Sequence, residues 1–210
     1  MAEVTLKPIE IVALGLLLER PMHPYEMYQI ATQRREDTVV KVSPGSLYRA
    51  VYALEQKGYA IAAQVEREGA RPERTLFEIT DPGRERLFVD VAELLRTPMT
   101  ERPRVLQALS EAHVLPAPRV RELLTERVAQ LGLRIDKLRA DIATVESLGV
   151  PEMYWINAPY QLTMYEAELA WLTAQLARFE SGALPWEDCR SPEERASATA
   201  AKTRNFYPAP

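Results

Sequence analysis

The stretch SPGSLYRAVYALEQKG at residues 43–58 decides the fold. Ser43 has the residue type of a helix N-cap, and Pro44 suits the first helical position. Gly58 is a typical stop signal after a helix. Between these limits the apolar side chains recur at helical spacing, which predicts one buried face made of Leu47, Val51 and Leu54. The stretch therefore predicts an amphipathic helix that ends at Lys57.

Two more helices are predicted before this one. Residues 8–19 read PIEIVALGLLLE, with a proline suited to the first turn and a wide apolar stripe. This composition predicts a deeply packed helix. A proline-rich turn at residues 20–24 ends it, and a second helix is predicted at residues 25–34. Residues 35–42 are polar and then β-branched, which predicts a connector.

After Gly58 the apolar period changes from that of a helix to that of a strand. Residues 59–65 and 75–79 alternate apolar and polar side chains, which predicts a β-hairpin with a charged tip at residues 67–74. Thr80, Asp81 and Pro82 then repeat the cap-and-proline start of a fourth helix. Its spacing predicts a buried side made of Leu87, Val91 and Leu94.

The second half of the chain predicts long helices. A break at residues 97–103 and a short helix at residues 104–112 precede a helix introduced by Pro116 and Pro118. Two series follow heptad spacing: Leu124, Val128, Leu131, Ile135, Leu138, Ile142 and Val145, then Leu162, Tyr165, Leu169, Leu172, Leu176 and Phe179. We expect these seams to dimerise the chain; the alternative is an antiparallel hairpin within one subunit. The expected dimerisation residues are Leu124, Val128, Leu131, Ile135, Leu138, Ile142, Leu169, Leu172 and Leu176.

The sequence thus predicts a mainly α protein in three parts. Residues 1–97 form the helix, helix, helix, hairpin, helix order of a winged helix-turn-helix, with the hairpin as a two-stranded wing. Residues 98–182 form a helical, coiled-coil-like dimerisation domain, and residues 183–210, poor in large apolar side chains, form a mobile tail. A hydrophobic fraction of 47% excludes a globally disordered chain.

The composition also limits the function. The chain carries a net charge of −4, so support for nucleic-acid binding must come from local charge. Cys189 is the only cysteine, which excludes an internal disulfide, and neither a signal peptide nor an apolar membrane span is visible. We therefore expect a cytoplasmic protein that does not contact a membrane.

Local charge gathers at the third helix and at the hairpin tip. At about 100° per residue, Ser46, Arg49, Ala50 and Ala53 fall opposite the buried stripe, with Lys57 below them. A third helix of this kind lies in the major groove, where an arginine can bind guanine with two hydrogen bonds. The expected DNA-binding residues are Ser43, Ser46, Tyr48, Arg49, Ala53, Lys57, Arg67, Arg71 and Arg74. For Tyr48, packing against the second helix is the alternative.

These motifs resemble the PadR family of transcriptional regulators. SPGSLY at residues 43–48, HPYE at residues 23–26 and GARPERT at residues 69–75 are similar to its recognition helix, the start of its second helix and its wing. Residues 100–180 are similar in layout to the helical domain of the longer, virulence-activator-like members. The resemblance implies a homodimer that regulates transcription, usually as a repressor, at an inverted-repeat operator. It also implies a response to small aromatic or amphipathic compounds.

Other functions fit less well. An enzyme or metal site finds no support, because His23 and His113 are the only histidines and no phosphate loop or nucleophile motif appears. We expect no cofactor and no metal. A winged helix used only for protein contacts is the second hypothesis, against which the polar outer face of the third helix argues. A possible effector site is the aromatic group Trp155, Tyr160, Met164 and Trp171, for which core packing is the alternative.

Overall fold

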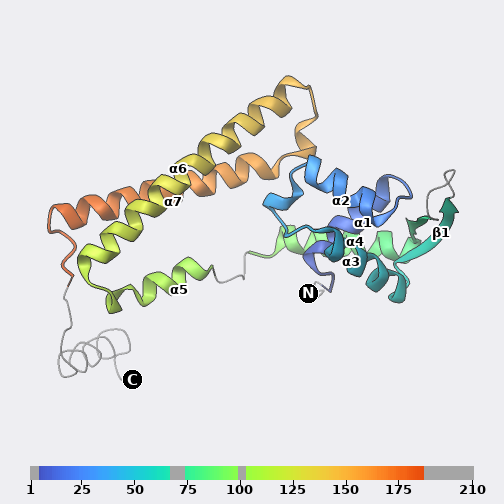
Figure 1. Cartoon of the computed structure of the whole chain (residues 1–210), viewed down its shortest axis with the longest axis horizontal. Helices are drawn as coiled ribbons and strands as arrows, with labels where there is room; N and C mark the ends of the chain where they lie inside the picture. Colours follow the sequence, from blue (N-terminus) through green and yellow to red (C-terminus); the bar gives the residue numbers. More distant parts are fainter. Residues whose placement is uncertain (1–4, 67–73, 99–102, 187–210) are drawn as a thin grey trace. The chain divides into compact units, whose positions relative to one another are not determined.

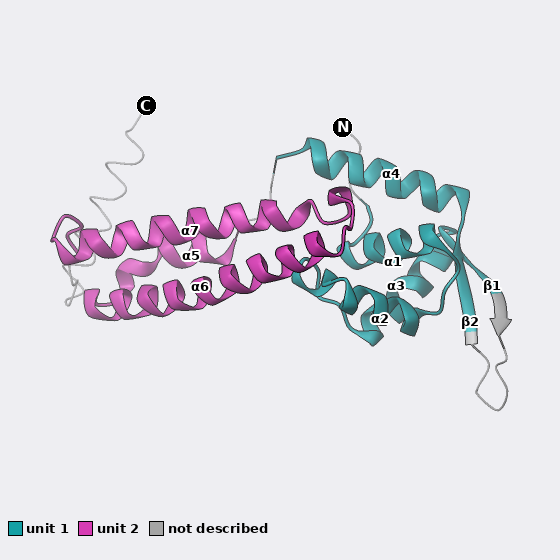
Figure 2. Ribbon diagram, turned by 90° about the horizontal axis from the view of Figure 1, so that it is seen from above, with its two compact units in different colours: residues 1–101 teal, residues 102–210 magenta. Residues whose placement is uncertain are grey.

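The computed structural model describes residues 5–66, 74–98 and 103–186. The chain divides into two compact units, Met1–Glu101 and Arg102–Pro210 (Figures 1 and 2). Within the described residues, the first unit contains α1 (Pro8–Glu19), α2 (Pro24–Gln33), the 3₁₀ turn η1 (Glu36–Thr38), α3 (Pro44–Gln56), β1 (Ala60–Glu66), β2 (Arg74–Ile79) and α4 (Asp81–Arg96). The second contains α5 (Arg104–Ser110), η2 (Ala112–Val114), α6 (Ala117–Ser147), η3 (Glu152–Tyr154) and α7 (Asn157–Glu180). The predicted winged helix-turn-helix followed by helices is confirmed.

The first unit is built around α1 and α3. The predicted stripe of α3 is confirmed, because Leu47, Val51 and Leu54 are all fully buried. They pack in one cluster with Leu14 of α1 and Phe77 of β2. Because α1 is apolar on most sides, it lies in the middle of this cluster, as its sequence predicted.

The wing is a two-stranded antiparallel sheet attached to the helices at its base. Ala60 pairs with Ile79 at the open end, and the register shifts between Ala62 and Gln64. Met22, in the link between α1 and α2, exchanges two backbone hydrogen bonds of 3.1 Å with Phe77. This bridge fixes the base of the wing to the helix-turn-helix.

The buried side predicted for α4 is wrong beyond its first residue. Leu87 is buried, but Val91 and Leu94 are 37% and 48% exposed. Asp90 and Glu93 occupy the inner face instead, with 0% and 5% exposure. The spacing of apolar residues cannot show that a carboxylate will be buried, because its burial depends on specific hydrogen-bond donors elsewhere in the fold. The face of α4 that packs inward therefore differs from the predicted one.

Gly83 allows the start of α4 to lie close to the end of α3. A Cβ at this position would stand 2.1 Å from the Tyr59 carbonyl oxygen, a backbone atom that cannot move without shifting the wing. We expect Gly83→Ala to destabilise the first unit by about 1–3 kcal/mol through overpacking, seen as a lower melting temperature. Gly15→Ala in α1 is the control, because its Cβ would meet nothing within 4 Å. That change should stabilise the helix by about 0.5–1 kcal/mol. Equal effects of the two variants would contradict the prediction.

In the second unit, α6 and α7 pack side by side as an antiparallel hairpin (Figures 1 and 2). Leu131, Ile135 and Leu172 form its buried centre. Further seam residues pack around them: Leu124, Val128, Leu162, Tyr165 and Leu169. Ion pairs flank the seam, with Arg127 bound to Glu168 and Arg139 to Glu166. The two heptad series therefore pack against each other within one chain.

The segment after α7 returns to the start of α6. The Trp186 indole N–H donates to the Leu115 carbonyl over 2.9 Å, and its ring lies 5.2 Å from that of Phe179. Residues 183–186, which the sequence assigned to the tail, are thus attached to the second unit. The rest of that segment lies outside the described residues.

Candidate nucleic-acid interface

The first turn of α3 is held by two serines. The Ser46 N–H donates to Ser43 Oγ over 3.2 Å, and the Ser43 N–H donates to Ser46 Oγ over 2.8 Å. The Ser46 hydroxyl in turn lies 2.8 Å from the Ser43 carbonyl oxygen, to which it donates. This reciprocal capping box fixes where the helix begins. Both hydroxyls therefore already have partners within the helix, and a contact of Ser46 with DNA would compete with them.

Arg49 presents its side chain on the outer surface of α3. It is exposed, and its Nη1 lies 3.4 Å from where a Cβ of Gly45 would stand, so the guanidinium lies beside the first turn. Within the described part of the chain, no carboxylate forms an ion pair with it. Ala53, one turn further on, is half-buried. Ala50, which the helical projection placed on this face, is only 4% exposed and belongs to the core.

Tyr48 connects α3 to the start of α2. Its hydroxyl lies 3.3 Å from His23 Nε2, and the two rings meet edge to face with 5.6 Å between centroids. His23 Nδ1 accepts the Tyr25 N–H and so caps α2. In neutral His23 the proton therefore sits on Nε2, which donates to the Tyr48 hydroxyl. Of the two expectations for Tyr48, these contacts favour packing against the second helix.

Lys57 is directed toward α1. Its ammonium nitrogen lies 2.8 Å from both carboxylate oxygens of Glu10, which is 1% exposed. The partner was not foreseen from the sequence, because Glu10 sits in an otherwise apolar helix. The sequence does contain one indication of this contact: Glu10 is a single acidic residue in a run whose apolar composition predicts full burial, and a buried acid needs a partner. Through this ion pair, Lys57 attaches the C-terminal end of α3 to α1.

The arginines that directly follow α1 and α2 form ion pairs. Arg34 binds Glu19 through both terminal guanidinium nitrogens, Nη1 and Nη2, and Arg20 binds Glu26. The hydrogen bond from Arg34 lowers the pKa of Glu19, and that from Arg20 lowers the pKa of Glu26. Both acids therefore stay charged at neutral pH. Arg49 differs from these residues because its charge is not neutralised by a neighbouring described carboxylate.

The basic tip of the wing is only partly within the structure. Arg67 and Arg71 lie outside the described residues. Arg74 begins β2, where its backbone pairs with Glu66. The predicted contact of these three arginines with DNA stays a prediction.

The expected effector residues lie in two settings of the second unit. The Trp155 indole N–H donates to the Val150 carbonyl over 3.0 Å, which ties it to the turn after α6. Tyr160, Met164 and Trp171 are 62%, 46% and 47% exposed on α7. At about 100° per residue these three fall on one face, opposite the side that packs on α6.

Most of the expected dimerisation residues pack against other residues of the same chain. Leu131, Ile135 and Leu172 are no more than 5% exposed. Leu124, Val128 and Leu169 pack against them. The half-buried members of the series are Leu138, Ile142 and Leu176.

The described residues offer neither a metal centre nor a membrane span. In the described segments, no group of three or more His, Cys, Asp or Glu side chains is placed to hold a metal ion. No helix among them is long and apolar enough to span a membrane. Cys189 lies outside the described residues.

Residues 13–88 match the model of the Transcriptional regulator PadR-like family. The fold is similar to that of Bacillus subtilis PadR in complex with operator DNA, with a TM-score of 0.68, 16% identity, and coverage of 82% of this chain and 99% of that one. It is similar to the Vibrio cholerae virulence activator AphA (TM-score 0.64, 18% identity, coverage 82% and 98%). It is also similar to Bacillus subtilis PadR in complex with p-coumaric acid (TM-score 0.63, 14% identity, coverage 83% and 99%). Identities this low show the shared fold alone. No curated protein matches the sequence.

Proposed function

The chain carries a domain of the PadR-like family of transcriptional regulators, and from this premise we propose that it is a sequence-specific DNA-binding repressor that acts as a homodimer. The observation that carries the proposal is Arg49, an exposed arginine on the outer face of the third helix of a winged helix. Such a side chain reads guanine in the major groove. The relative with this fold that was crystallised with operator DNA supports the same use of the fold.

Selection of bound sequences from random duplex DNA tests this function. Two subunits related by a two-fold axis should enrich an inverted repeat with half-site centres about 10–10.5 base pairs apart, or a multiple of that. The salt dependence of binding to the enriched sequence then gives the number of phosphate contacts. A protein that enriches no sequence and is not retained on duplex DNA at low salt would instead be a winged-helix protein-interaction module.

We propose the outer face of α7 as the dimer surface. The apolar residues of the seam between α6 and α7 are covered within one chain, so a second copy must pack on another apolar face. The outer stripe consists of Ile156, Tyr160, Met164, Ala167, Trp171 and Ala174. These six residues carry no charge, and Arg178, further along the same face, is the first charged residue after them. Glu166 and Glu168 lie off this stripe and bind arginines of α6. Exposed Trp, Tyr and Met side chains without charges are typical of the centre of a protein interface.

The same surface is a candidate for regulation by a small aromatic acid. We propose that such a compound binds near Tyr160, Met164 and Trp171 and lowers operator affinity. The relative crystallised with p-coumaric acid supports this class of ligand. Titration with phenolic acids should quench tryptophan fluorescence, and linkage requires operator DNA to weaken the acid's binding by the same factor. If the acid quenches the fluorescence but operator DNA does not weaken its binding, then the acid binds the protein without regulating it.

A further inference from the structure

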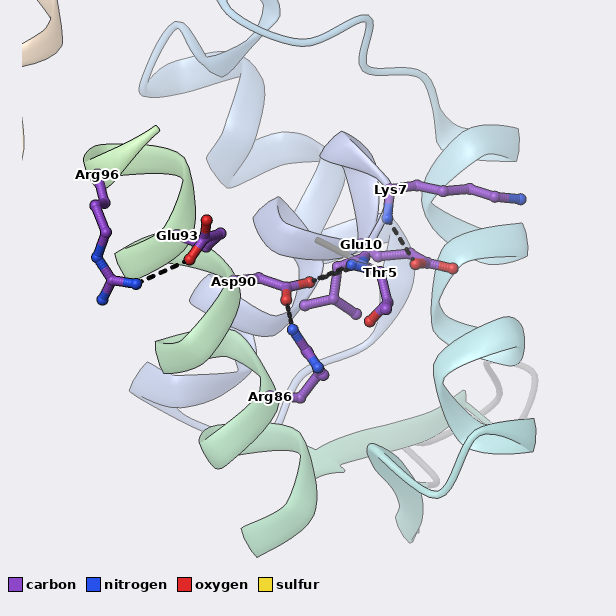
Figure 3. Close-up of polar contacts among 8 residues, drawn as sticks. Thr5, Lys7, Glu10, Arg86, Asp90, Glu93 and Arg96 are labelled. Carbon is purple, nitrogen blue, oxygen red and sulfur yellow. Dashed lines mark hydrogen bonds and ion pairs between the residues drawn. The ribbon is translucent and has the colours of Figure 1, made fainter. Parts of the chain in front are cut away.

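Two buried carboxylates hold the N-terminal segment of the first unit. Three successive backbone N–H groups donate to them: Thr5 and Leu6 to Asp90 Oδ2, over 3.1 and 2.7 Å, and Lys7 to Glu10 Oε2, over 2.9 Å (Figure 3). We call residues 5–7 the N-terminal strap. It joins α4, which carries Asp90, to α1, which carries Glu10.

Each carboxylate has a second partner that extends the connection. Asp90 is 0% exposed, and its Oδ1 accepts from Arg86 on the same helix (Figure 3). Glu10 is 1% exposed, and both of its oxygens bind Lys57, the residue that caps the C-terminal end of α3. Hydrogen bonds and ion pairs thus run without a gap from α4 through the strap and Glu10 to the recognition helix.

This connection is stiff for physical reasons. A buried carboxylate that loses a partner keeps its desolvation penalty, so each contact strongly resists separation. The Leu6 side chain is 5% exposed within the core and anchors the middle of the strap. A shift of α4 against α1 therefore either breaks contacts of Asp90 or moves the strap, and with it Glu10 and Lys57.

We propose that the strap couples the position of α4 to that of the recognition helix, with Asp90, Glu10 and Lys57 as positioning residues for DNA binding. The inference rests on the proposed function. In the sequence α4 directly precedes the second unit, so the coupling offers a route by which events there change operator affinity. Lys57 then acts on DNA through α3 and does not bind a phosphate itself.

Glu93 provides a matched control on α4. It is a second buried carboxylate on that helix, 5% exposed, and it binds Arg96 (Figure 3) and the Thr97 hydroxyl at the end of α4. Loss of its charge removes a buried ion pair without touching the strap. If buried carboxylates of α4 only stabilise the fold, Asp90→Asn and Glu93→Gln should affect DNA binding alike.

The experiment compares Asp90→Asn, Glu93→Gln, Lys57→Met and the Asp90→Asn/Lys57→Met double variant in the full chain. We measure binding to the selected operator and to unrelated duplex DNA at a temperature where circular dichroism shows each variant folded. Asp90→Asn and Lys57→Met should each weaken operator binding by roughly 2- to 30-fold, the range of coupling seen along physical networks. The double variant should lose no more than the larger single loss, and Glu93→Gln should leave the preference for operator unchanged.

Several results would overturn the coupling. One is an equal loss of operator affinity in Asp90→Asn and Glu93→Gln, and another is additive losses of affinity in the double variant. The third is a salt dependence of binding in Lys57→Met that falls by about one phosphate contact. Lys57→Arg keeps the ion pair and should restore operator affinity. Glu10→Gln repeats the test from α1 should Asp90→Asn not fold.

Hydrogen exchange gives a readout that needs no DNA. Asp90→Asn should speed amide exchange in the last turn of α3, whereas Glu93→Gln should not; unchanged exchange in Asp90→Asn contradicts the coupling. If the parent protein binds no DNA while exchange responds as expected, the proposed function fails and the coupling stands.

Discussion

Trp171→Glu should convert the proposed homodimer into a monomer that keeps its helices. Trp171 is 47% exposed on the outer face of α7, within the stripe from Ile156 to Ala174 whose members carry no charge, so the subunit's own core does not depend on it. A second copy would bury the glutamate among the apolar side chains of the stripe, which is strongly unfavourable. Loss of the second half-site contact should then lower affinity for the full operator by about 10²–10⁴. Sedimentation and circular dichroism measure the mass and the helix content.

The next residue along the chain is the matched control. Leu172 is 1% exposed in the seam between α6 and α7. Leu172→Glu should therefore unfold the second unit, since an uncompensated buried charge costs about 3–5 kcal/mol. The opposite pattern, in which Leu172→Glu gives a folded monomer and Trp171→Glu stays dimeric, would make the seam the dimer surface and the hairpin a partner-dependent structure. Trp171→Phe keeps the apolar surface and should remain a dimer.

The sequence was sufficient for the parts of the fold that depend on local signals. The Ser43 cap, the proline after it and the buried stripe of α3 all follow from short-range rules, and the structure confirms them. The hairpin is equally local, because a change of period and a charged tip define it. These features also carried the resemblance to PadR regulators, which the family match at residues 13–88 confirms.

Buried charges limited the prediction of the site. Periodicity assigned Val91 to the inner face of α4, whereas Asp90 lies there because backbone N–H groups 84 and 85 residues away donate to it. Helical projection puts Lys57 on the DNA face, and the pattern of α3 cannot show its ion pair with Glu10, which lies 47 residues away. Neither partner can be read from the pattern of one helix, since each contact exists only after the tertiary fold has formed.

The heptad seams show a different limit. Their spacing predicts that each helix has one apolar face, but it does not say which helix covers that face. The sequence left both pairings open, and in the structure Leu131 and Ile135 of α6 pack with Leu172 of α7 in the same chain. The seam variant Leu131→Arg should therefore damage the subunit's own core. Because the inner seam is covered within the chain, the apolar residues on the outer face of α7 are the ones left for a second copy.

Arg49→Ala should produce the largest loss of operator binding among single changes on α3. One good bidentate contact to guanine is worth about 1–3 kcal/mol of discrimination. Because a two-fold dimer loses the contact in both half-sites, the total becomes about 2–6 kcal/mol, or roughly 30-fold to 10⁴-fold in affinity. The side chain is exposed on the first turns of α3, so the variant should melt at the parent's temperature. Electrophoretic mobility shift or fluorescence anisotropy at fixed salt measures the affinity.

Two arginine variants separate reading of bases from general attraction to DNA. Arg34→Ala removes the same charge, but Arg34 is bound to Glu19 between α1 and α2, so operator binding should change little. Arg49→Lys keeps the charge and loses the planar fork, so it should restore binding to unrelated DNA while preference at one base pair of each half-site stays relaxed. If Arg49→Ala and Arg34→Ala weaken binding equally, and to all sequences alike, then Arg49 contributes only charge. In that case another part of the fold, with the wing arginines as the next candidates, must read the operator.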